Sequence, residues 1–269
     1  MSEIAPTARL EAHFESVRER TQLTRCFAKS PLKIAKTFPL ESGVRVCVMD
    51  CSPGMLAGDH YEFSWHLGAN TAVEVTTQGF TRVHPSLAHP CTLHQKIALE
   101  PGAYLEHFPE PLMLFHDAAI KTECQVDLAP KATLLMGEIV CAGRIERGEV
   151  FAFRSWQSRT RVRRAGKLIY VAQNALRPDT LTPSCVGSWG DYTHAGTFCV
   201  FSPHVGAEFL PALRALLENR ESSNVWAGAS QLDCGALVVS LLGRRAHDLQ
   251  ELTHQMRLCV RQHLACTLS

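Results

Sequence analysis

The chain has 269 residues, of which 27 are Lys or Arg and 26 are Asp or Glu, so its formal net charge is only +1 at pH 7. A chain of this length can bury roughly three quarters of the surface that its unfolded form exposes, which is enough for one large domain or two small ones. Because the charges nearly cancel, no global electrostatic attraction favours nucleic acid or an anionic membrane, and we expect neither as a partner.

The cysteines and the N-terminal sequence predict a soluble chain in a reducing compartment. There are 11 cysteines, an odd number, and no two of them form a Cys-x-x-Cys pair. Their share is well below the roughly 8–10% that marks a disulfide scaffold, so we expect reduced thiols. Residues 1–10 lack an apolar signal core, and no run approaches the about 18 apolar residues of a membrane span. We therefore expect a cytoplasmic protein.

Period-two alternation of apolar and polar residues dominates the chain after an N-terminal segment (residues 1–35). The alternation is clearest from Tyr61 to Leu67 and persists to about residue 200. Turns rich in Gly and Pro, such as Glu100-Pro101-Gly102, punctuate it, and nothing between them has the length or period of a crossover helix. The sequence therefore predicts a β-rich body over residues 36–200, whose strands are joined by turns.

A weak internal repeat indicates how these strands are arranged. Three segments share a Leu, a polar step and a return to apolar alternation, and they begin 32 and then 29 residues apart, at Leu67, Leu99 and Leu128. One such unit cannot bury its own apolar face, so the repeat favours stacked sheets of short strands that wind helically on themselves. A protein rich in hairpins can also give such matches by chance, and this alternative stays open here.

The pattern becomes helical after Phe201. Apolar residues have helical spacing over residues 209–217 and again, in a longer stripe, over residues 249–263, while residues 236–242 are typical of a strand. Residues 201–269 are thus expected to form an α/β C-terminal part of one 269-residue domain, with two α-helices. The longer stripe either closes the core, the commoner outcome, or faces a partner helix. Its polar side is expected to carry Arg257 and Arg261.

One pair of segments suggests an enzyme. His60-Tyr61-Glu62, followed by Pro90-Cys91-Thr92-Leu93-His94, comes close to the H-x-E and P-C-x-x-C pattern of zinc deaminases, in which metal ligands activate water and the Glu moves protons. The fit is incomplete, because His94 replaces the final Cys and His60 lies in an alternating segment instead of at a helix N-terminus. A zinc-dependent, deaminase-like hydrolase using His60, Glu62, Cys91 and His94 is the alternative enzyme hypothesis.

The same region gathers imidazole and thiol groups in a short stretch, at His84, His89, Cys91 and His94. Such ligands suit zinc or nickel. Their irregular spacing favours a simpler interpretation, a loop followed by a strand with solvent-facing histidines.

A basic cluster is the last candidate site. Alternation through residues 159–163 predicts that several of its side chains lie on one strand face. A single-strand nucleic-acid groove would interleave stacking aromatic residues, and only Trp156 is available, so we expect a solvated or protein-facing surface. No phosphate loop, H-E-x-x-H or G-x-S-x-G motif occurs, so any nucleotide hydrolysis must come from another subunit. The cluster comprises Arg154, Arg159, Arg161, Arg163, Arg164 and Lys167.

Two stretches together carry a resemblance to a known family. The first is Ser52-Pro53-Gly54-Met55-Leu56-Ala57-Gly58-Asp59 followed by Thr76-Thr77-Gln78-Gly79-Phe80-Thr81-Arg82-Val83-His84. The second is Glu138-Ile139-Val140-Cys141-Ala142-Gly143-Arg144 followed by Gly148-Glu149-Val150-Phe151-Ala152-Phe153. In this order and spacing, from about Phe38 to the C-terminus, the chain resembles the UreD/UreH family of urease accessory proteins, and most of all its Helicobacter-type UreH branch.

The resemblance implies a mostly β fold with two C-terminal helices and a maturation scaffold that is not an enzyme. It implies nickel insertion into apo-urease, with UreF and the GTPase UreG as partners, UreE as the nickel carrier, and a homodimer within a UreG-UreF-UreH-type complex. No tightly bound cofactor is implied, only transient nickel(II).

The resemblance further implies a nickel channel whose polar lining maps onto Asp59, Thr81 and Glu138. Isolated oxygen ligands bind weakly enough to release an ion, whereas several Cys and His ligands would retain it. Asp59 is equally well suited to capping a turn after Gly58. Relatives tend to place an acidic residue after Ile169-Tyr170, where this chain has Ala172 and Gln173.

Overall fold

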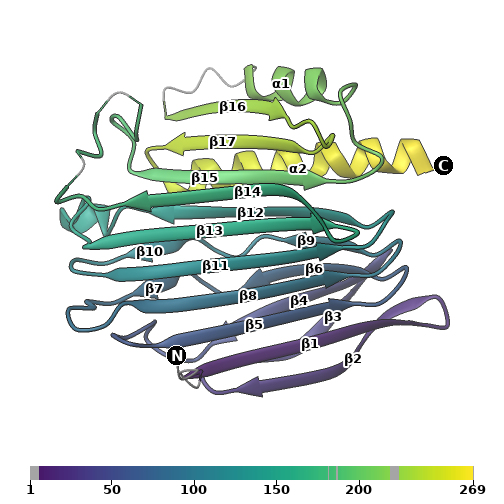
Figure 1. Cartoon of the computed structure of the whole chain (residues 1–269), viewed down its shortest axis with the longest axis horizontal. Helices are drawn as coiled ribbons and strands as arrows, with labels where there is room; N and C mark the ends of the chain where they lie inside the picture. Colours follow the sequence, from purple (N-terminus) through teal and green to yellow (C-terminus); the bar gives the residue numbers. More distant parts are fainter. Residues whose placement is uncertain (1–5, 181, 186, 219–223, 269) are drawn as a thin grey trace.

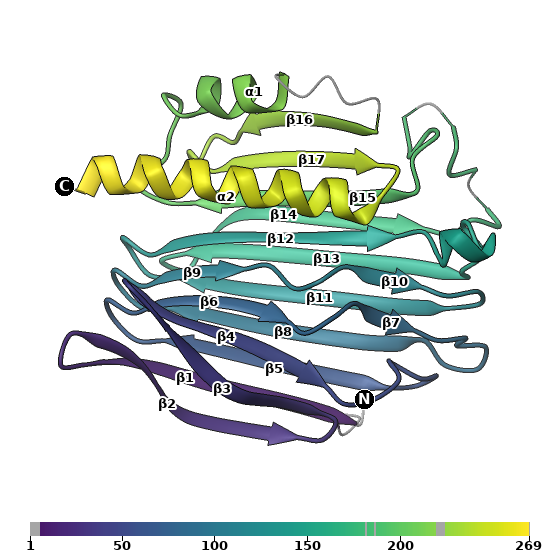
Figure 2. The same ribbon diagram turned by 180° about the vertical axis from the view of Figure 1, so that it is seen from behind.

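The computed structural model describes residues 6–180, 182–185, 187–218 and 224–268, with side chains to residue 265. Two β-sheets are stacked face to face, and two helices lie on the outer side of the larger sheet (Figures 1 and 2). The main core lies between the sheets, where Phe14, Trp65 and Leu105 are almost fully buried. No described helix is long and apolar enough to cross a membrane.

The smaller sheet has seven strands, in the order β14-β13-β11-β8-β5-β1-β2. Neighbours from β1 to β13 run parallel, whereas β2 and β14, at the two edges, pair antiparallel to their neighbours. The strands are β1 (Ala8–Val17), β2 (Arg20–Lys29), β5 (His60–Leu67), β8 (Cys91–Leu99), β11 (Ala119–Leu128), β13 (Ser155–Arg164) and β14 (Lys167–Leu176).

The larger sheet has ten strands, eight of them in the order β16-β17-β15-β12-β9-β6-β4-β3, with β7 and β10 attached beside β12. Its middle strands β4, β6, β9 and β12 are parallel, and the pairs at both ends are antiparallel. The strands are β3 (Leu32–Leu40), β4 (Gly43–Asp50), β6 (Ala72–Thr77), β7 (Thr81–Val83), β9 (Tyr104–His107), β10 (Leu112–Leu114), β12 (Thr133–Cys141), β15 (His194–Phe201), β16 (Val225–Gln231) and β17 (Leu237–Gly243).

The chain winds between the two sheets, and the sequence repeat marks three equivalent crossings. The repeat segments join β5 to β6, β8 to β9 and β11 to β12. Their first residues stack in register, since Leu67 lies beside Leu99 and Leu99 beside Leu128. The prediction of stacked, helically wound sheets is therefore confirmed.

A turn with the same conformation closes each crossing. Asn70, Gly102 and Lys131 occupy the same repeat position and all have positive φ, of 57°, 73° and 65°. A backbone hydrogen bond spans each turn, and Pro101 and Pro130 precede two of these residues. Positive φ at the third position with Pro at the second is the signature of a type II turn. A Cβ at Gly102 would lie 2.2 Å from Oδ1 of Asn70, so a side chain here would displace that of Asn70 in the neighbouring turn.

The β structure begins earlier than the sequence pattern indicates. Strand β1 pairs in parallel with β5 throughout and buries Leu10 and Phe14. Strands β1, β2 and the start of β3 thus lie within the 35 residues that the sequence set apart as an N-terminal segment.

The C-terminal part has the two predicted helices, α1 (Leu210–Glu218) and α2 (Ala246–Leu268), with two strands between them where the sequence indicated one. The missed strand is β16, which is rich in small residues. Figure 2 shows α2 lying across the outer face of the larger sheet. Its apolar stripe packs against Leu135, Phe198 and Val239 in a second core, so the stripe closes the core. The buried apolar residues in the described part of α2 are Leu249, Leu252, Met256, Val260 and Leu264.

The expectation that Arg257 and Arg261 lie on the polar side of this helix is wrong. Both guanidinium groups face the sheet and form ion pairs with Glu74 of β6 and Glu106 of β9. The Glu106 side chain is fully buried, and the hydroxyl of Tyr104 also donates to it, at 2.5 Å. Buried carboxylates need such partners, and the sequence pattern cannot show that the sheet supplies them.

Candidate functional site

A cavity of about 150 Å³ lies between the two sheets. Two of the three residues that the sequence analysis placed in a channel, Thr81 and Glu138, line it. Thr81 begins the short strand β7, where its N–H donates to the carbonyl of Pro111 (3.1 Å). The other polar and charged lining residues are Thr77, Gln95, His107, Glu110, Thr122, Glu123, Ser158, Thr160, Tyr170, Asn174 and Thr197.

Glu138 reaches into this cavity from β12. The one hydrogen bond to its carboxyl comes from the Ser158 hydroxyl of the opposite sheet, and it is long, at 3.4 Å. No ion pair joins Glu138 to a cation among the described residues, in contrast to the paired Glu74 and Glu106. Burial raises the pKa of the Glu138 carboxyl. The cavity thus contains an acidic oxygen donor that the fold leaves almost unpaired.

Two cysteines that the sequence analysis did not select line the same cavity. Burial raises the pKa of Cys124 and of Cys199 to about 12 in each case, so both are neutral thiols at pH 7. Gln95 Nε2 lies 3.6 Å from the Cys124 sulfur, and the Cys199 sulfur lies 3.9 Å from the hydroxyl of Tyr170. Both side chains therefore present neutral sulfur to the cavity when no metal is bound. The sequence signal that could have identified these cysteines is their position on the inward-facing side of segments with period-two alternation.

The cavity approaches α2 through an interruption in the larger sheet. Residues 108–111, between β9 and β10, break the strand, and the N–H of Glu110 donates to the Thr77 hydroxyl (2.9 Å). A second hollow of about 130 Å³ lies beneath α2, where Gln250 donates to the Glu110 carboxylate (2.7 Å). Both spaces are lined by Pro109, Glu110, Gly137, Glu138, Ile139 and Thr197.

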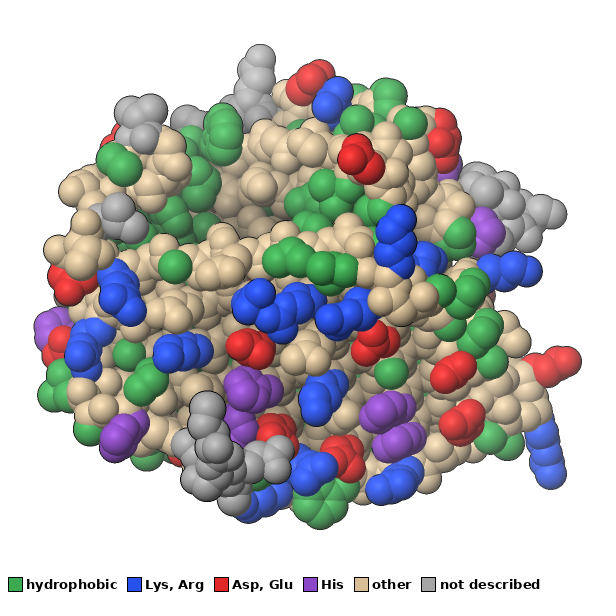
Figure 3. Space-filling model, in the orientation of Figure 1, with side chains coloured by type: hydrophobic (Ala, Val, Ile, Leu, Met, Phe, Trp, Pro, Cys, Tyr) green, Lys and Arg blue, Asp and Glu red, His purple; other side chains and the backbone are tan. Residues whose placement is uncertain are grey.

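On the other side, the cavity borders a groove of about 410 Å³ between β14 of the smaller sheet and strands β15, β16 and β17 of the larger sheet. The groove is lined by Trp189, Trp226 and Leu242, and Figure 3 shows a hollow on this side of the molecule, above a band of Lys and Arg side chains. Glu138 and its register partner Thr197 border all three spaces. They are therefore placed where these spaces meet.

Asp59 lies outside the residues that line the cavity. Its carboxylate accepts a hydrogen bond from the N–H of Leu56 (2.7 Å), and its own N–H donates to the Leu56 carbonyl (2.9 Å). These contacts close the turn before β5, which is the structural role that the sequence also allowed for it. At the position where relatives tend to be acidic, Ala172 lines the cavity and Gln173 pairs with Arg159 of β13.

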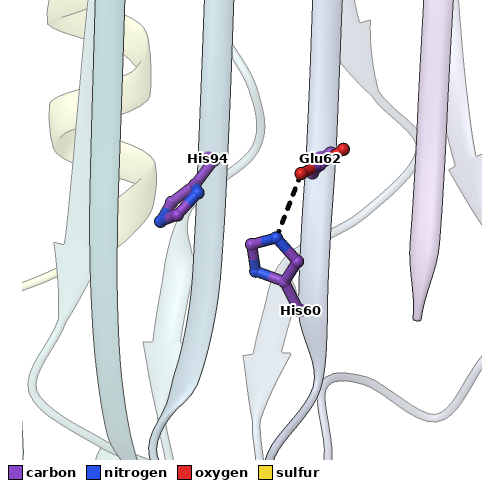
Figure 4. A group of neighbouring side chains, drawn as sticks. All are labelled: His60, Glu62 and His94. Carbon is purple, nitrogen blue, oxygen red and sulfur yellow. Dashed lines mark hydrogen bonds and ion pairs between the residues drawn. The ribbon is translucent and has the colours of Figure 1, made fainter. Parts of the chain in front are cut away.

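The four residues of the deaminase hypothesis are not brought together. His60, Glu62 and His94 lie side by side on β5 and β8 (Figure 4). Cys91 is fully buried, and its thiol donates to the carbonyl of Leu56 (3.1 Å). Because Cys91 and His94 are an odd number of residues apart on one strand, they face opposite sides of the sheet.

The second group of histidines is also dispersed. A ring nitrogen of His84 lies 3.1 Å from the carbonyl of Pro53, and the ring packs edge-on against Phe115. His89 is exposed in the loop before β8. The simpler interpretation, a loop followed by a strand with a solvent-facing histidine, describes this stretch.

The basic cluster is only partly a single surface. Arg159 and Arg163 alternate along β13 opposite the buried Ser158 and Val162, so they lie on the outer face of the smaller sheet, as predicted. Figure 3 shows Lys and Arg side chains forming a band across this face. Arg154 instead donates to the carbonyl of Leu87, at 2.6 Å.

Comparison with known proteins gives matches along nearly the whole chain. The family model described as "UreD urease accessory protein" matches residues 6–268. A urease accessory protein UreD of Haloarcula marismortui is 31% identical over 91% of this chain and 83% of its own length. One from Actinobacillus pleuropneumoniae serotype 5b is 31% identical over 87% and 89%. The urease accessory protein UreH of Helicobacter hepaticus is 25% identical over 86% and 89%.

Proposed function

The chain belongs to the UreD family of urease accessory proteins, and on that premise we propose that it assists the insertion of nickel into apo-urease. In this proposal the protein is a cytoplasmic scaffold without catalytic activity of its own. It acts as a homodimer in a complex with UreF and the GTPase UreG, and UreE delivers the nickel.

The setting of Glu138 is the observation that carries this proposal. This half-buried carboxyl has a raised pKa and one long hydrogen bond, and desolvating an acidic group without a close partner destabilises a fold. Such a group is expected where it has a functional task. A divalent cation in the cavity would compensate its charge, and a few carboxylate, hydroxyl and amide oxygens would release the ion again.

The arrangement of the cavity supports passage in preference to storage. Glu138 and Thr197 border the interior cavity, the hollow beneath α2 and the groove beside Trp226. We propose that nickel(II) moves between the two sides of the larger sheet by way of Glu138, with Thr81 among the lining oxygens.

The test is a Glu138→Gln variant in cells that express urease and its accessory proteins at limiting nickel. Glutamine keeps the shape but removes the charge, so urease activation is expected to fall at least about tenfold while UreF and UreG still co-purify. Glu100→Gln, at an exposed Glu in a crossing turn, is the matched control and should activate urease normally. Unchanged activation with Glu138→Gln would refute the role of this carboxyl.

A further inference from the structure

The outer face of the smaller sheet carries a cluster that the proposed nickel path does not use. His60 and Glu62 project from β5, and His94 projects from β8 beside them (Figure 4). Their potential ligand atoms all lie within 4.8 Å of one another. Within the described part of the chain, this is the one group of three His, Cys, Asp or Glu side chains with such spacing.

The spacing of the first two ligand atoms already suits a bound metal. His60 Nε2 lies 3.1 Å from Glu62 Oε1. Two ligand atoms at about 2.0–2.1 Å from a tetrahedral zinc ion are about 3.3 Å apart, so this pair needs almost no adjustment. The ring of His94 stands edge-on to that of His60, with the ring centroids 4.7 Å apart. The remaining movement needed is a rotation of the His94 side chain that turns a ring nitrogen toward the same ion.

Thr92 orients the His60 ring from the neighbouring strand. Its hydroxyl oxygen lies 2.6 Å from His60 Nδ1, while Nε2 faces the Glu62 carboxylate. Metal-ligating histidines commonly use the second ring nitrogen in this way, which fixes the tautomer. A carboxylate and an imidazole lone pair at this distance repel each other unless a proton or a cation lies between them. The pair is therefore arranged to hold one or the other.

The surroundings leave the ligand atoms available. The side chain of His60 is only 11% exposed and that of Glu62 33%, so both are held by the sheet. Arg9 lies 3.8 Å from Oε2 of Glu62, the oxygen that does not face His60.

We propose that His60, Glu62 and His94 bind one first-row divalent cation of the zinc or nickel type on the outer face of the smaller sheet. Two imidazoles and one carboxylate suit these ions, whereas calcium and magnesium prefer sites made of oxygen ligands. Three protein ligands leave a coordination position open to water or to a donor from another molecule. The site lies on the face opposite Phe63 and Leu93, which line the interior cavity, and does not depend on the proposed nickel path.

Calorimetric titration of the metal-stripped full chain with zinc chloride, and separately with nickel chloride, tests the site. His94→Ala and Glu62→Gln are expected to weaken binding at this site by more than about tenfold, since loss of a mere outer partner already costs 10–100-fold. His66→Ala, which removes a histidine from the same strand and face, is the matched control and should bind like the wild type. Magnesium chloride should give no binding at this site. Glu138→Gln should leave the site intact, which separates it from the interior path.

Thr92 supplies a second test of the geometry. Thr92→Val keeps the shape of the side chain but removes the hydroxyl, and it should weaken zinc binding about 10–100-fold, whereas Thr92→Ser should restore it. Melting temperatures of all variants check that the sheet is intact, and anomalous diffraction at the zinc edge locates the ion. The proposal is overturned if neither metal binds the wild type, if His94→Ala binds both metals as the wild type does, or if the zinc peak lies elsewhere.

Discussion

The half-buried carboxyl of Glu138 has one weak hydrogen-bond donor among the described residues, Ser158. Because burial raises its pKa, the folded state binds this proton more tightly than the unfolded chain does. Its favourable contribution to stability is therefore fully present below the unfolded pKa of about 4.3 and is lost as the pH rises through the raised, folded value. At neutral pH this residue weakens the fold.

Glu138→Gln should consequently raise the melting temperature at pH 7 while lowering urease activation. The expected gain in the free energy of unfolding is about 1 kcal/mol, the lower end of the penalty for an unsatisfied buried polar group. Thermal unfolding measured from pH 4 to pH 8 should also show that, as the pH rises above the unfolded pKa of Glu138, the melting temperature falls less in the variant than in the wild type. A lower melting temperature in the variant would mean that Glu138 is a structural residue.

At the scale of elements, α2 is fastened to the larger sheet by charge as well as by its apolar stripe. Burial alone would raise the pKa of the Glu106 carboxyl, but hydrogen bonds from Arg261 and the charge of Arg257 outweigh it and hold the pKa below its usual value. A depressed pKa contributes stability that is present above the unfolded value and is lost as the pH falls through the folded one. The attachment of α2 should therefore weaken in acid.

Glu106→Gln tests this attachment. It leaves Arg257 and Arg261 without their fully buried partner, and the expected loss is about 3 kcal/mol at pH 7, the lower end for breaking a buried ion pair. The loss should begin to shrink below the unfolded pKa of about 4.3, where the unfolded wild-type chain takes up a proton, and should disappear only as the pH falls through the lowered pKa of folded Glu106. Denaturant unfolding at pH 7 and pH 3.5 measures both values, and an equal loss at the two pH values would contradict the assignment.

The crossing turns give a second prediction at this scale. Gly102→Ala places a Cβ against Asn70 in a backbone conformation with φ of 73°, so it should destabilise the fold by at least about 1 kcal/mol. Gly79→Ala is the matched control, because a Cβ there meets nothing within 4 Å. Urea unfolding of both variants checks the difference, and equal stabilities would show that the stacked turns tolerate a side chain.

At the scale of the whole molecule, the apolar stripe of α2 lies in the core and is not the surface that this helix offers to a partner. Removing residues 244–269 would remove the buried Leu249 and Met256, so loss of UreF capture by that truncation would not identify an interface. Leu258, on the outward side of α2, is 41% exposed and offers a cleaner test of whether this helix contacts UreF.

Leu258→Asp should weaken UreF capture at least about fivefold without changing the melting temperature, as expected when an apolar contact worth about 1 kcal/mol is lost. Leu168→Asp on β14, at a position 48% exposed in the other sheet, is the control. Surface-bound UreF and graded concentrations of each variant give the affinities. Equal capture by Leu258→Asp and the wild type would place the UreF contact elsewhere.

The sequence predicted the parts of this architecture that repeat locally. The segments beginning at Leu67, Leu99 and Leu128 gave the winding of the sheets, and the stripe from Leu249 gave the last helix, because both depend on short-range periodicity. The parallel pairing of β1 with β5 and the contact of Arg261 with Glu106 were missed, since each joins residues far apart in the sequence. Family resemblance indicated Glu138, and the deaminase-like pattern grouped His60, Glu62 and His94 with Cys91. Only the register of β5 and β8 shows that the first three share an outer face without Cys91.

The antiparallel strands at the sheet edges have a consequence for how the molecule behaves at high concentration. A stack of parallel coils ends in open strand edges that another stack can extend, which is how fibres grow. Here the winding stops at both ends of each sheet with a strand that turns back on its neighbour, as β2 does on β1 and β14 on β13. Strand β2 also carries Arg20, Arg25 and Lys29, and charged edges oppose further pairing. The same hairpins that complete the fold thus protect it from polymerising end to end.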